Sequence, residues 1–170
     1  MTAATLARFE NQADYLVNPA PQKTHTDDGV IAQALAILAK RMRAPGVVFT
    51  APGDAKTFCS LQLGSLDHEV FGVLFLDVQN KLIEFQKMFR GTLTQTSVYP
   101  REIVKECIRL DASSVVFTHN HPSGNTNPSR ADELLTQTLK STLGLIDVRV
   151  LDHIIVSAHE SLSMAERGLM

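Results

Sequence analysis

Two histidines separated by one residue follow a short apolar stretch, and they limit how this chain can fold more than any other feature. The stretch 114–117 (SVVF) is apolar and β-branched, which predicts a buried strand. Residues two apart in an extended chain project from the same face, so His119 and His121 can both point at one ion. The alternative is that both are exposed loop residues, but their spacing and their place at a strand end favour metal ligation.

A loop and the start of a helix follow the two histidines. Regular structure is broken by two prolines and a glycine, which are Pro122, Gly124 and Pro128. From Ser129 the chain has the pattern of a helix with Asp132 in its first turn. Two imidazoles and one carboxylate make three ligands and leave a fourth position for water, as in a catalytic zinc site. We therefore expect His119, His121 and Asp132 to bind one Zn²⁺ ion per chain.

The spacing of Ser129 and Asp132 also has a purely structural explanation. A serine at a helix N-cap with an acid three residues later resembles a capping box, in which side chain and backbone bond reciprocally. The two explanations are compatible, because such a cap holds the hydroxyl near the loop and places the carboxylate on the adjacent rim. Glu133 is the competing carboxylate, but it lies about 100° further round the helix.

An almost continuously apolar run at 69–76 (EVFGVLFL) predicts a central strand that is covered on both faces. A turn at 77–81 and a returning strand complete a hairpin. The expected elements are helices over 30–43, 52–63, 101–110 and 129–143, strands over 47–50, 69–76, 82–89 and 114–118, and a final strand pair or one long bent strand over 147–157. This order predicts an α/β (α+β) mixed sheet with helices on its faces.

The length of the chain indicates a single domain. At 170 residues it is long enough to close one core, and we expect a flexible leader over 1–28 and one domain over 29–170. Two cysteines, Cys59 and Cys107, are too few and too far apart for a disulfide framework. Residues 1–10 lack the apolar core of a signal peptide, and no apolar run approaches the ~20 residues of a membrane span. These features favour a reduced, cytoplasmic setting without a membrane partner.

The order His-x-His, seven residues, then Ser-x-x-Asp resembles the signature of the JAMM (MPN+) metalloproteases. The stretch 118–124 (THNHPSG) is closer still to the RadC-like branch of that superfamily. Four other stretches are similar to the same branch, namely 69–77 (EVFGVLFLD), 89–92 (FRGT), 99–103 (YPREI) and 152–156 (DHIIV). The resemblance covers roughly residues 50–168 and implies the JAMM/MPN fold, a curved mixed β-sheet flanked by helices.

Glu69 is the candidate general base. A carboxylate that opens an apolar strand is costly to bury unless it is paired or used, although a polar strand end at the surface would also explain it. The resemblance favours the catalytic role, because JAMM enzymes carry an upstream glutamate on the strand beside the His-x-His strand. It implies a zinc metallopeptidase that cleaves an amide or isopeptide bond in a protein or peptide conjugate. Glu69 would activate the metal-bound water, and zinc with the Ser129 hydroxyl would stabilise the oxyanion.

Two further residues in the matching stretches have open roles. His153 either supports the metal site, contacts the substrate, or is a strand histidine satisfied by hydrogen bonds. Arg101 stands near a helix start, where a cation is electrostatically unfavourable, so we expect a carboxylate partner such as Glu102 or a bound anion.

A second function comes from the same resemblance. Longer RadC-like proteins carry an N-terminal helix-hairpin-helix region, a potential DNA-binding module, and this chain resembles the short form without it. The alternative is therefore a DNA-associated accessory protein of repair or mobile elements, with a structural or vestigial metal site. The net charge of −2 gives nucleic-acid binding no support. A catalytically silent scaffold is a third alternative, but it would lack a ligand, and none is missing. The substrate and the oligomeric state are not determined by the sequence.

Overall fold

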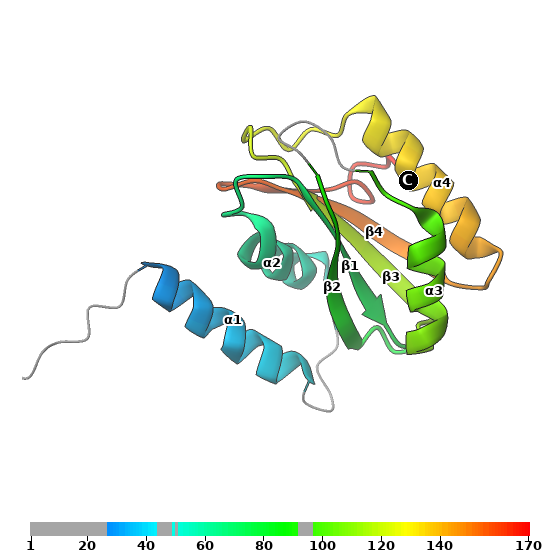
Figure 1. The fold of residues 1–170 in the computed structure, drawn as a ribbon, viewed down its shortest axis with the longest axis horizontal. Helices are drawn as coiled ribbons and strands as arrows, with labels where there is room; N and C mark the ends of the chain where they lie inside the picture. Colours follow the sequence, from blue (N-terminus) through cyan, green and yellow to red (C-terminus); the bar gives the residue numbers. More distant parts are fainter. Residues whose placement is uncertain (1–26, 44–48, 50, 92–96) are drawn as a thin grey trace, which may run out of the picture.

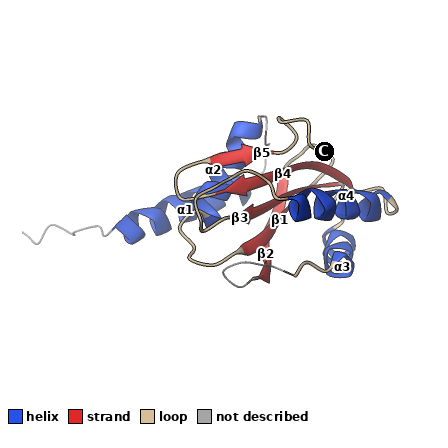
Figure 2. Ribbon diagram, turned by 90° about the horizontal axis from the view of Figure 1, so that it is seen from above, coloured by secondary structure: helices blue, strands red, loops and turns tan. Residues whose placement is uncertain are grey.

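A five-stranded mixed sheet forms the centre of the protein, whose computed structural model describes residues 27–43, 49, 51–91 and 97–170. The strands are β1 (Val70–Leu76), β2 (Leu82–Arg90), β3 (Ser114–Asn120), β4 (Arg149–Val156) and β5 (Ser161–Ser163). Their order is β2-β1-β3-β4-β5 (Figures 1 and 2, with β5 labelled in Figure 2). β3 and β4 are parallel, whereas the other neighbouring strands are antiparallel. The predicted α/β mixed-sheet fold is therefore confirmed.

Helices cover both faces of this sheet (Figures 1 and 2). They are α1 (Asp27–Arg43), α2 (Pro52–Leu63), α3 (Pro100–Leu110) and α4 (Arg130–Gly144). α2 packs on one face with α1 beside it, and α3 and α4 pack on the other face. The bounds of α2 agree with the predicted helix 52–63.

The apolar run of β1 serves both of these layers. Leu74 and Leu76 pack in the core beneath α2, whereas Phe71 and Val73 pack in the core beneath α3 and α4. Every residue of β1 and of β3 is buried. Because neither face of these strands meets water, both faces need apolar side chains, and this explains the continuous run in the sequence.

One end of the sheet gathers the segments that the sequence marks as functional. The carboxyl ends of the parallel strands β3 and β4 meet there, and antiparallel β1 begins there, with Phe71 opposite His119. Parallel neighbours need a crossover connection, and α4 is that connection. Its amino-terminal turn therefore follows the loop that leaves β3 and returns to the same end of the sheet (Figure 1).

Two strands differ from the expected bounds. β3 continues to Asn120, two residues beyond the expected end, so that His119 lies inside the strand. Of the two alternatives expected over 147–157, the single strand is found: it is β4, and its antiparallel partner β5 lies beyond that range. The predicted strand ended early because the residues that close β3 are polar, yet Thr118, His119 and Asn120 are all buried there.

Two expectations fall mainly outside the described residues. These are the leader over 1–28, of which only Asp27 and Asp28 are described, at the start of α1, and the strand over 47–50. Within the latter only Phe49 is described, and it lies outside the sheet. None of the helices described is both long and apolar enough to cross a bilayer.

Candidate metal centre

The first two candidate ligands stand at the end of β3. His119 is a buried strand residue, only 6% exposed, and His121 follows one residue after the strand. The backbone N–H of His121 donates to the carbonyl oxygen of Val156 at 2.9 Å, which continues the β3–β4 pairing past the end of the strand. The chain therefore stays extended through His121, and both imidazoles lie on the same face of the sheet, as the spacing predicted.

The third candidate ligand is held by a capping box at the start of α4. The backbone N–H and the hydroxyl of Ser129 donate to Oδ2 of Asp132 at 2.7 Å and 2.6 Å. The backbone N–H of Asp132 donates back to the Ser129 hydroxyl at 3.2 Å. Glu133 pairs with Arg130 at 2.7 Å instead of facing the histidines. The helix cap thus fixes the Asp132 carboxylate in place, so its capping role is compatible with a role as a metal ligand.

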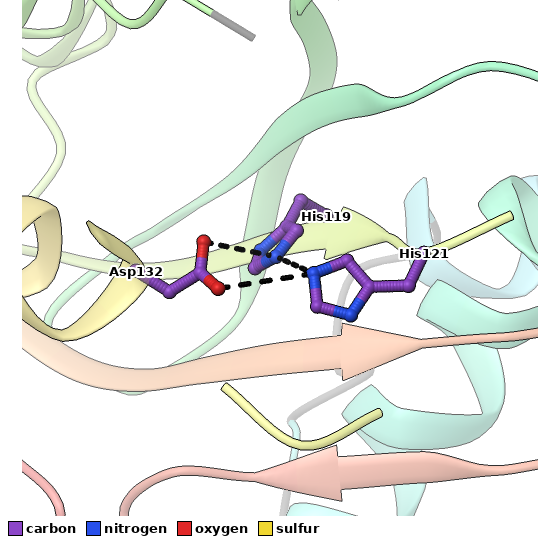
Figure 3. A group of neighbouring side chains, drawn as sticks. All are labelled: His119, His121 and Asp132. Atoms are coloured by element: carbon purple, nitrogen blue, oxygen red, sulfur yellow. Dashed lines mark hydrogen bonds and ion pairs between the residues drawn. The ribbon is translucent and has the colours of Figure 1, made fainter. Parts of the chain in front are cut away.

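Three potential ligand atoms converge between the strand end and the helix start (Figure 3). Nε2 of His119 lies 2.9 Å from Nε2 of His121 and 3.3 Å from Oδ1 of Asp132, and the His121 nitrogen lies 3.8 Å from Oδ2 of Asp132. Ligand atoms around a tetrahedral zinc ion are about 3.3 Å apart, given bond lengths near 2.0 Å. In the described part of the chain this is the one group of three or more His, Cys, Asp or Glu residues with metal-binding geometry. These three residues could therefore hold a metal ion.

The protonation of the two rings suits metal binding. Nδ1 of His121 lies 2.6 Å from the carbonyl oxygen of Asn125, which can only accept, so Nδ1 donates this hydrogen bond and, in the neutral imidazole, the lone pair is on Nε2. Burial lowers the pKa of His119 to about 4, with the Asp132 carboxylate raising it and His121 lowering it further. At neutral pH His119 is therefore a neutral imidazole, which is the form that binds a metal.

His153 lies directly behind His119. It is completely buried on β4 opposite Phe117, and its Nε2 is 2.9 Å from Nδ1 of His119. Its other ring nitrogen is 2.6 Å from the hydroxyl of Thr136 on α4. Burial, together with His119 and His121, holds the pKa of His153 well below its usual range. Of the alternatives that the sequence left open, substrate contact does not fit a completely buried ring.

Glu69 immediately precedes β1, beside the end of β3. Phe71, two residues further along the chain, pairs with His119, so Glu69 lies at the end of the sheet where His121 leaves β3. The backbone of Glu69 is fixed by an N–H from Gly91, which donates to its carbonyl oxygen at 2.8 Å. The register therefore brings the half-buried Glu69 to the end of the sheet that carries the candidate ligands. Its role as general base stays a prediction.

Asn120 is a functional residue that the sequence reasoning missed. It stands between the two histidines, so its side chain projects to the opposite face, where it is almost fully buried. Its amide oxygen accepts from the backbone N–H of Val70 at 2.8 Å, and its amide nitrogen donates to the carbonyl oxygens of His68 at 2.9 Å and Leu66 at 3.3 Å. One side chain thus ties the segment that contains Glu69 to β3. The feature of the sequence that could have indicated this role is a polar residue between the two candidate histidine ligands.

Three other residues singled out in the sequence are not among the candidate ligands. Arg101 pairs with Glu102 at 3.2 Å, the carboxylate partner that was expected. Cys59 and Cys107 are free thiols, and both are buried. Burial raises the pKa of Cys59 to about 12 and that of Cys107 to about 11, so neither is a thiolate at neutral pH.

A mixed α/β sheet with two histidines and an aspartate converging at a strand end defines a class of domain with a candidate divalent-metal centre. A family model described as RadC-like JAB domain matches residues 49–169 of this chain. The chain therefore belongs to the RadC-like JAB domain family, as the resemblance of its motifs implied.

Several bacterial relatives are more than half identical to the chain, and all carry the name UPF0758 protein. The protein from Albidiferax ferrireducens is 63% identical over 72% of this chain and 53% of its own length. Those from Variovorax paradoxus and Leptothrix cholodnii are 56% and 55% identical, over 83% and 81% of this chain. The chain spans 62% and 64% of these two relatives, and so less than two thirds of the length of each relative named here.

Proposed function

We propose that this chain is a zinc-dependent hydrolase of JAMM type that cleaves an amide or isopeptide bond. The observation that supports this most is the convergence of His119, His121 and Asp132 at one end of the sheet, with their ligand atoms within 4.8 Å of one another. Three protein ligands leave one coordination position open, and this is the arrangement of catalytic rather than structural zinc sites.

His119, His121 and Asp132 would hold the metal ion, which when bound would supply Lewis acidity by lowering the pKa of water and polarising a carbonyl oxygen. Glu69, at the end of the sheet where β3 closes, accepts a proton from the attacking water and returns it to the leaving amine. The Ser129 hydroxyl donates to the oxygen on which negative charge develops. To do so it turns away from Asp132, whose Oδ2 still accepts the backbone N–H of Ser129.

The proposed substrate is a protein or peptide conjugate, and an isopeptide to a lysine side chain is the form that fits JAMM chemistry. This part of the proposal rests on the membership of the RadC-like JAB family. A DNA-associated accessory role is the outcome to which a failure of the hydrolase tests would point.

Metal analysis tests the ligand set. Purified wild-type protein should contain about one zinc ion per chain, because one complete ligand set is present. The double variant His119→Ala/His121→Ala should contain none. Undiminished zinc in the double variant would show that the ion binds elsewhere.

Two carboxylate variants separate the proposed base from the proposed ligand. Glu69→Gln preserves shape but removes the proton acceptor, so zinc content should stay near that of the wild type while turnover falls by about 10²–10⁴-fold. Asp132→Asn should lose zinc and turnover together, because a neutral amide is a poorer zinc ligand than a carboxylate. The substrate is to be found by comparing lysine-branched peptides in cells that express wild type or Glu69→Gln. Zinc lost from Glu69→Gln but kept by Asp132→Asn would reverse the two roles, and unchanged turnover in both would end the hydrolase proposal.

A further inference from the structure

A chain of buried hydrogen bonds runs from the back of His119 to the main chain of Asp132. Nδ1 of His119 is 2.9 Å from Nε2 of His153, and Nδ1 of His153 is 2.6 Å from the hydroxyl oxygen of Thr136. That hydroxyl oxygen is in turn 2.6 Å from the carbonyl oxygen of Asp132. His153 and Thr136 are completely buried, and His119 nearly so. The four residues belong to β3, β4 and the first turns of α4.

The donor and the acceptor of each of these hydrogen bonds follow from the last bond in the series, the one to the carbonyl oxygen of Asp132. A carbonyl oxygen has no proton to give, and two oxygens 2.6 Å apart must share one, so the Thr136 hydroxyl donates to Asp132. Its single proton is then used, and it must accept a proton from Nδ1 of His153. A neutral imidazole carries one ring proton, so Nε2 of His153 is an acceptor and Nδ1 of His119 is its donor.

We propose that His153 and Thr136 are positioning residues, which fix the Nδ1–H tautomer of His119 and thereby aim its Nε2 lone pair at the metal ion. The inference rests on the proposed function only for the presence of that ion, and it does not depend on which bond is hydrolysed. It assigns a role to two residues that touch neither the ion nor the substrate.

The two histidine ligands reach the same tautomer by different routes. His121 lies at the surface loop and needs one acceptor, the carbonyl oxygen of Asn125. His119 is buried in β3, and among the described residues no backbone carbonyl supplies its Nδ1 with an acceptor, so the imidazole of His153 takes that place. Asp132 interacts with both ends of this arrangement. Its carboxylate oxygen Oδ1 lies 3.3 Å from Nε2 of His119, and its main-chain carbonyl oxygen accepts the last hydrogen bond, from Thr136.

Thr136 provides the sharper variants, because valine has nearly the same shape but neither gives nor takes a hydrogen bond. Thr136→Val removes the acceptor of His153 Nδ1, whereas Thr136→Ser keeps the hydroxyl. Thr138→Val is the matched control, since the Thr138 hydroxyl makes the same kind of bond to the carbonyl of Leu134 at 2.8 Å on the exposed face of α4.

The first measurement is the tautomer of His119 in metal-free protein, read from long-range proton–nitrogen correlation spectra. Wild type, Thr136→Ser and Thr138→Val should show His119 protonated on Nδ1 alone. Thr136→Val should show a mixture of the two tautomers, because His153 is free to protonate Nε2. Finding His153 protonated on Nε2 in the wild type, or an unchanged His119 tautomer in Thr136→Val, would overturn the inference.

The second measurement is zinc affinity, determined by competition with a chromogenic chelator. Thr136→Val should bind zinc about 10–100-fold more weakly than wild type, which is the usual effect of losing a partner behind a metal ligand. Thr136→Ser should restore the affinity, and Thr138→Val should leave it unchanged. Equal affinities in all four proteins would refute the positioning role. If the tautomer and affinity results hold but no amide is ever cleaved, the proposed function fails and this inference survives.

Discussion

The buried imidazoles of His119 and His153 make the metal-free protein sensitive to acid. Both rings are neutral in the folded state because burial lowers their pKa, and for His119 the value falls to about 4. In the unfolded chain the pKa of histidine is near ~6.5. Between these values the unfolded chain binds more protons than the folded one, so the free energy of unfolding rises with pH across this window and is flat above it.

The first prediction at this scale concerns that window. Lowering the pH from 7 to 5 should reduce the free energy of unfolding of chelator-treated protein by about 2 kcal/mol through His119 alone, with a further loss through His153. Urea unfolding at the two pH values measures the difference. His153→Gln, which removes one of the two rings, should show a smaller loss. Equal stability at pH 5 and pH 7 would contradict the buried, neutral state of these rings.

Ser129 is both the N-cap residue of α4 and the proposed oxyanion donor, and substitution by glycine separates these two roles. Glycine is itself a tolerated N-cap residue, so Ser129→Gly should cost only a few tenths of a kcal/mol in stability, whereas Ser129→Ala should cost about 1 kcal/mol. Both variants lack the hydroxyl, so turnover should fall by about 10²-fold in both. Turnover that follows stability, and not the hydroxyl, would leave the serine with the capping role alone.

At the scale of elements, the end of β3 presents functional candidates on one face of the sheet and a supporting side chain on the other. The two histidines project toward α4, and Asn120 between them projects to the other side and fixes the backbone that leads into β1. A single strand end therefore sets the position of the two candidate histidine ligands and of the backbone that leads to Glu69. The alternating geometry of an extended chain makes this possible with three consecutive residues.

Asn120→Leu should separate the two effects of this strand end, zinc binding by the histidines and positioning of Glu69. The variant leaves the N–H of Val70 and the carbonyl oxygen of His68 without their partner, which should cost about 1–3 kcal/mol in the free energy of unfolding. Zinc content should be kept, because no ligand is changed, but turnover should fall because Glu69 loses its fixed backbone. Gln79→Leu, in the exposed hairpin turn, is the control and should alter neither quantity. Normal turnover in Asn120→Leu would show that Asn120 is not needed to position Glu69.

At the scale of the whole molecule, neither of the two main hydrophobic cores includes a candidate metal ligand. One core is formed with α2 and the other with α3 and α4, and both consist of residues that do not bind the ion. The fold should therefore persist without metal, unlike that of a zinc finger. Bound metal should still stabilise it, because the ligands join β3 to α4 only in the folded state.

Thermal unfolding with chelator and with excess zinc tests this expectation. Metal-free protein should give a cooperative transition, and zinc at about 100 times its dissociation constant should add about 2.7 kcal/mol to the free energy of unfolding. The double variant His119→Ala/His121→Ala should fold and show no response to zinc. A wild-type chain that is unfolded after metal removal would show that the cores alone do not maintain the fold.

The candidate ligands were predictable because their geometry is local. Strand alternation relates His119 to His121, and the capping-box spacing places Asp132, so neither step needs knowledge of distant contacts. The supporting residues depend on registers between segments far apart in the chain. Asn120 meets residues 66–70, and His153 reaches His119 only because β4 lies parallel to β3. Strand order and register are set by tertiary packing, and so the sequence left the role of His153 open and missed those of Asn120 and Thr136.

The short span of chain between the three candidate ligands has a consequence for how the protein folds. All of them lie between residues 119 and 132, whereas the sheet partners of β3 come from segments well before and well after. Loops of about 10 residues close in roughly 10–100 ns, far faster than strands distant in the chain find their register. An ion present during refolding can thus be captured by this segment before β1 and β4 have docked. Zinc would then influence the order in which the sheet assembles, and not only the stability of the finished fold.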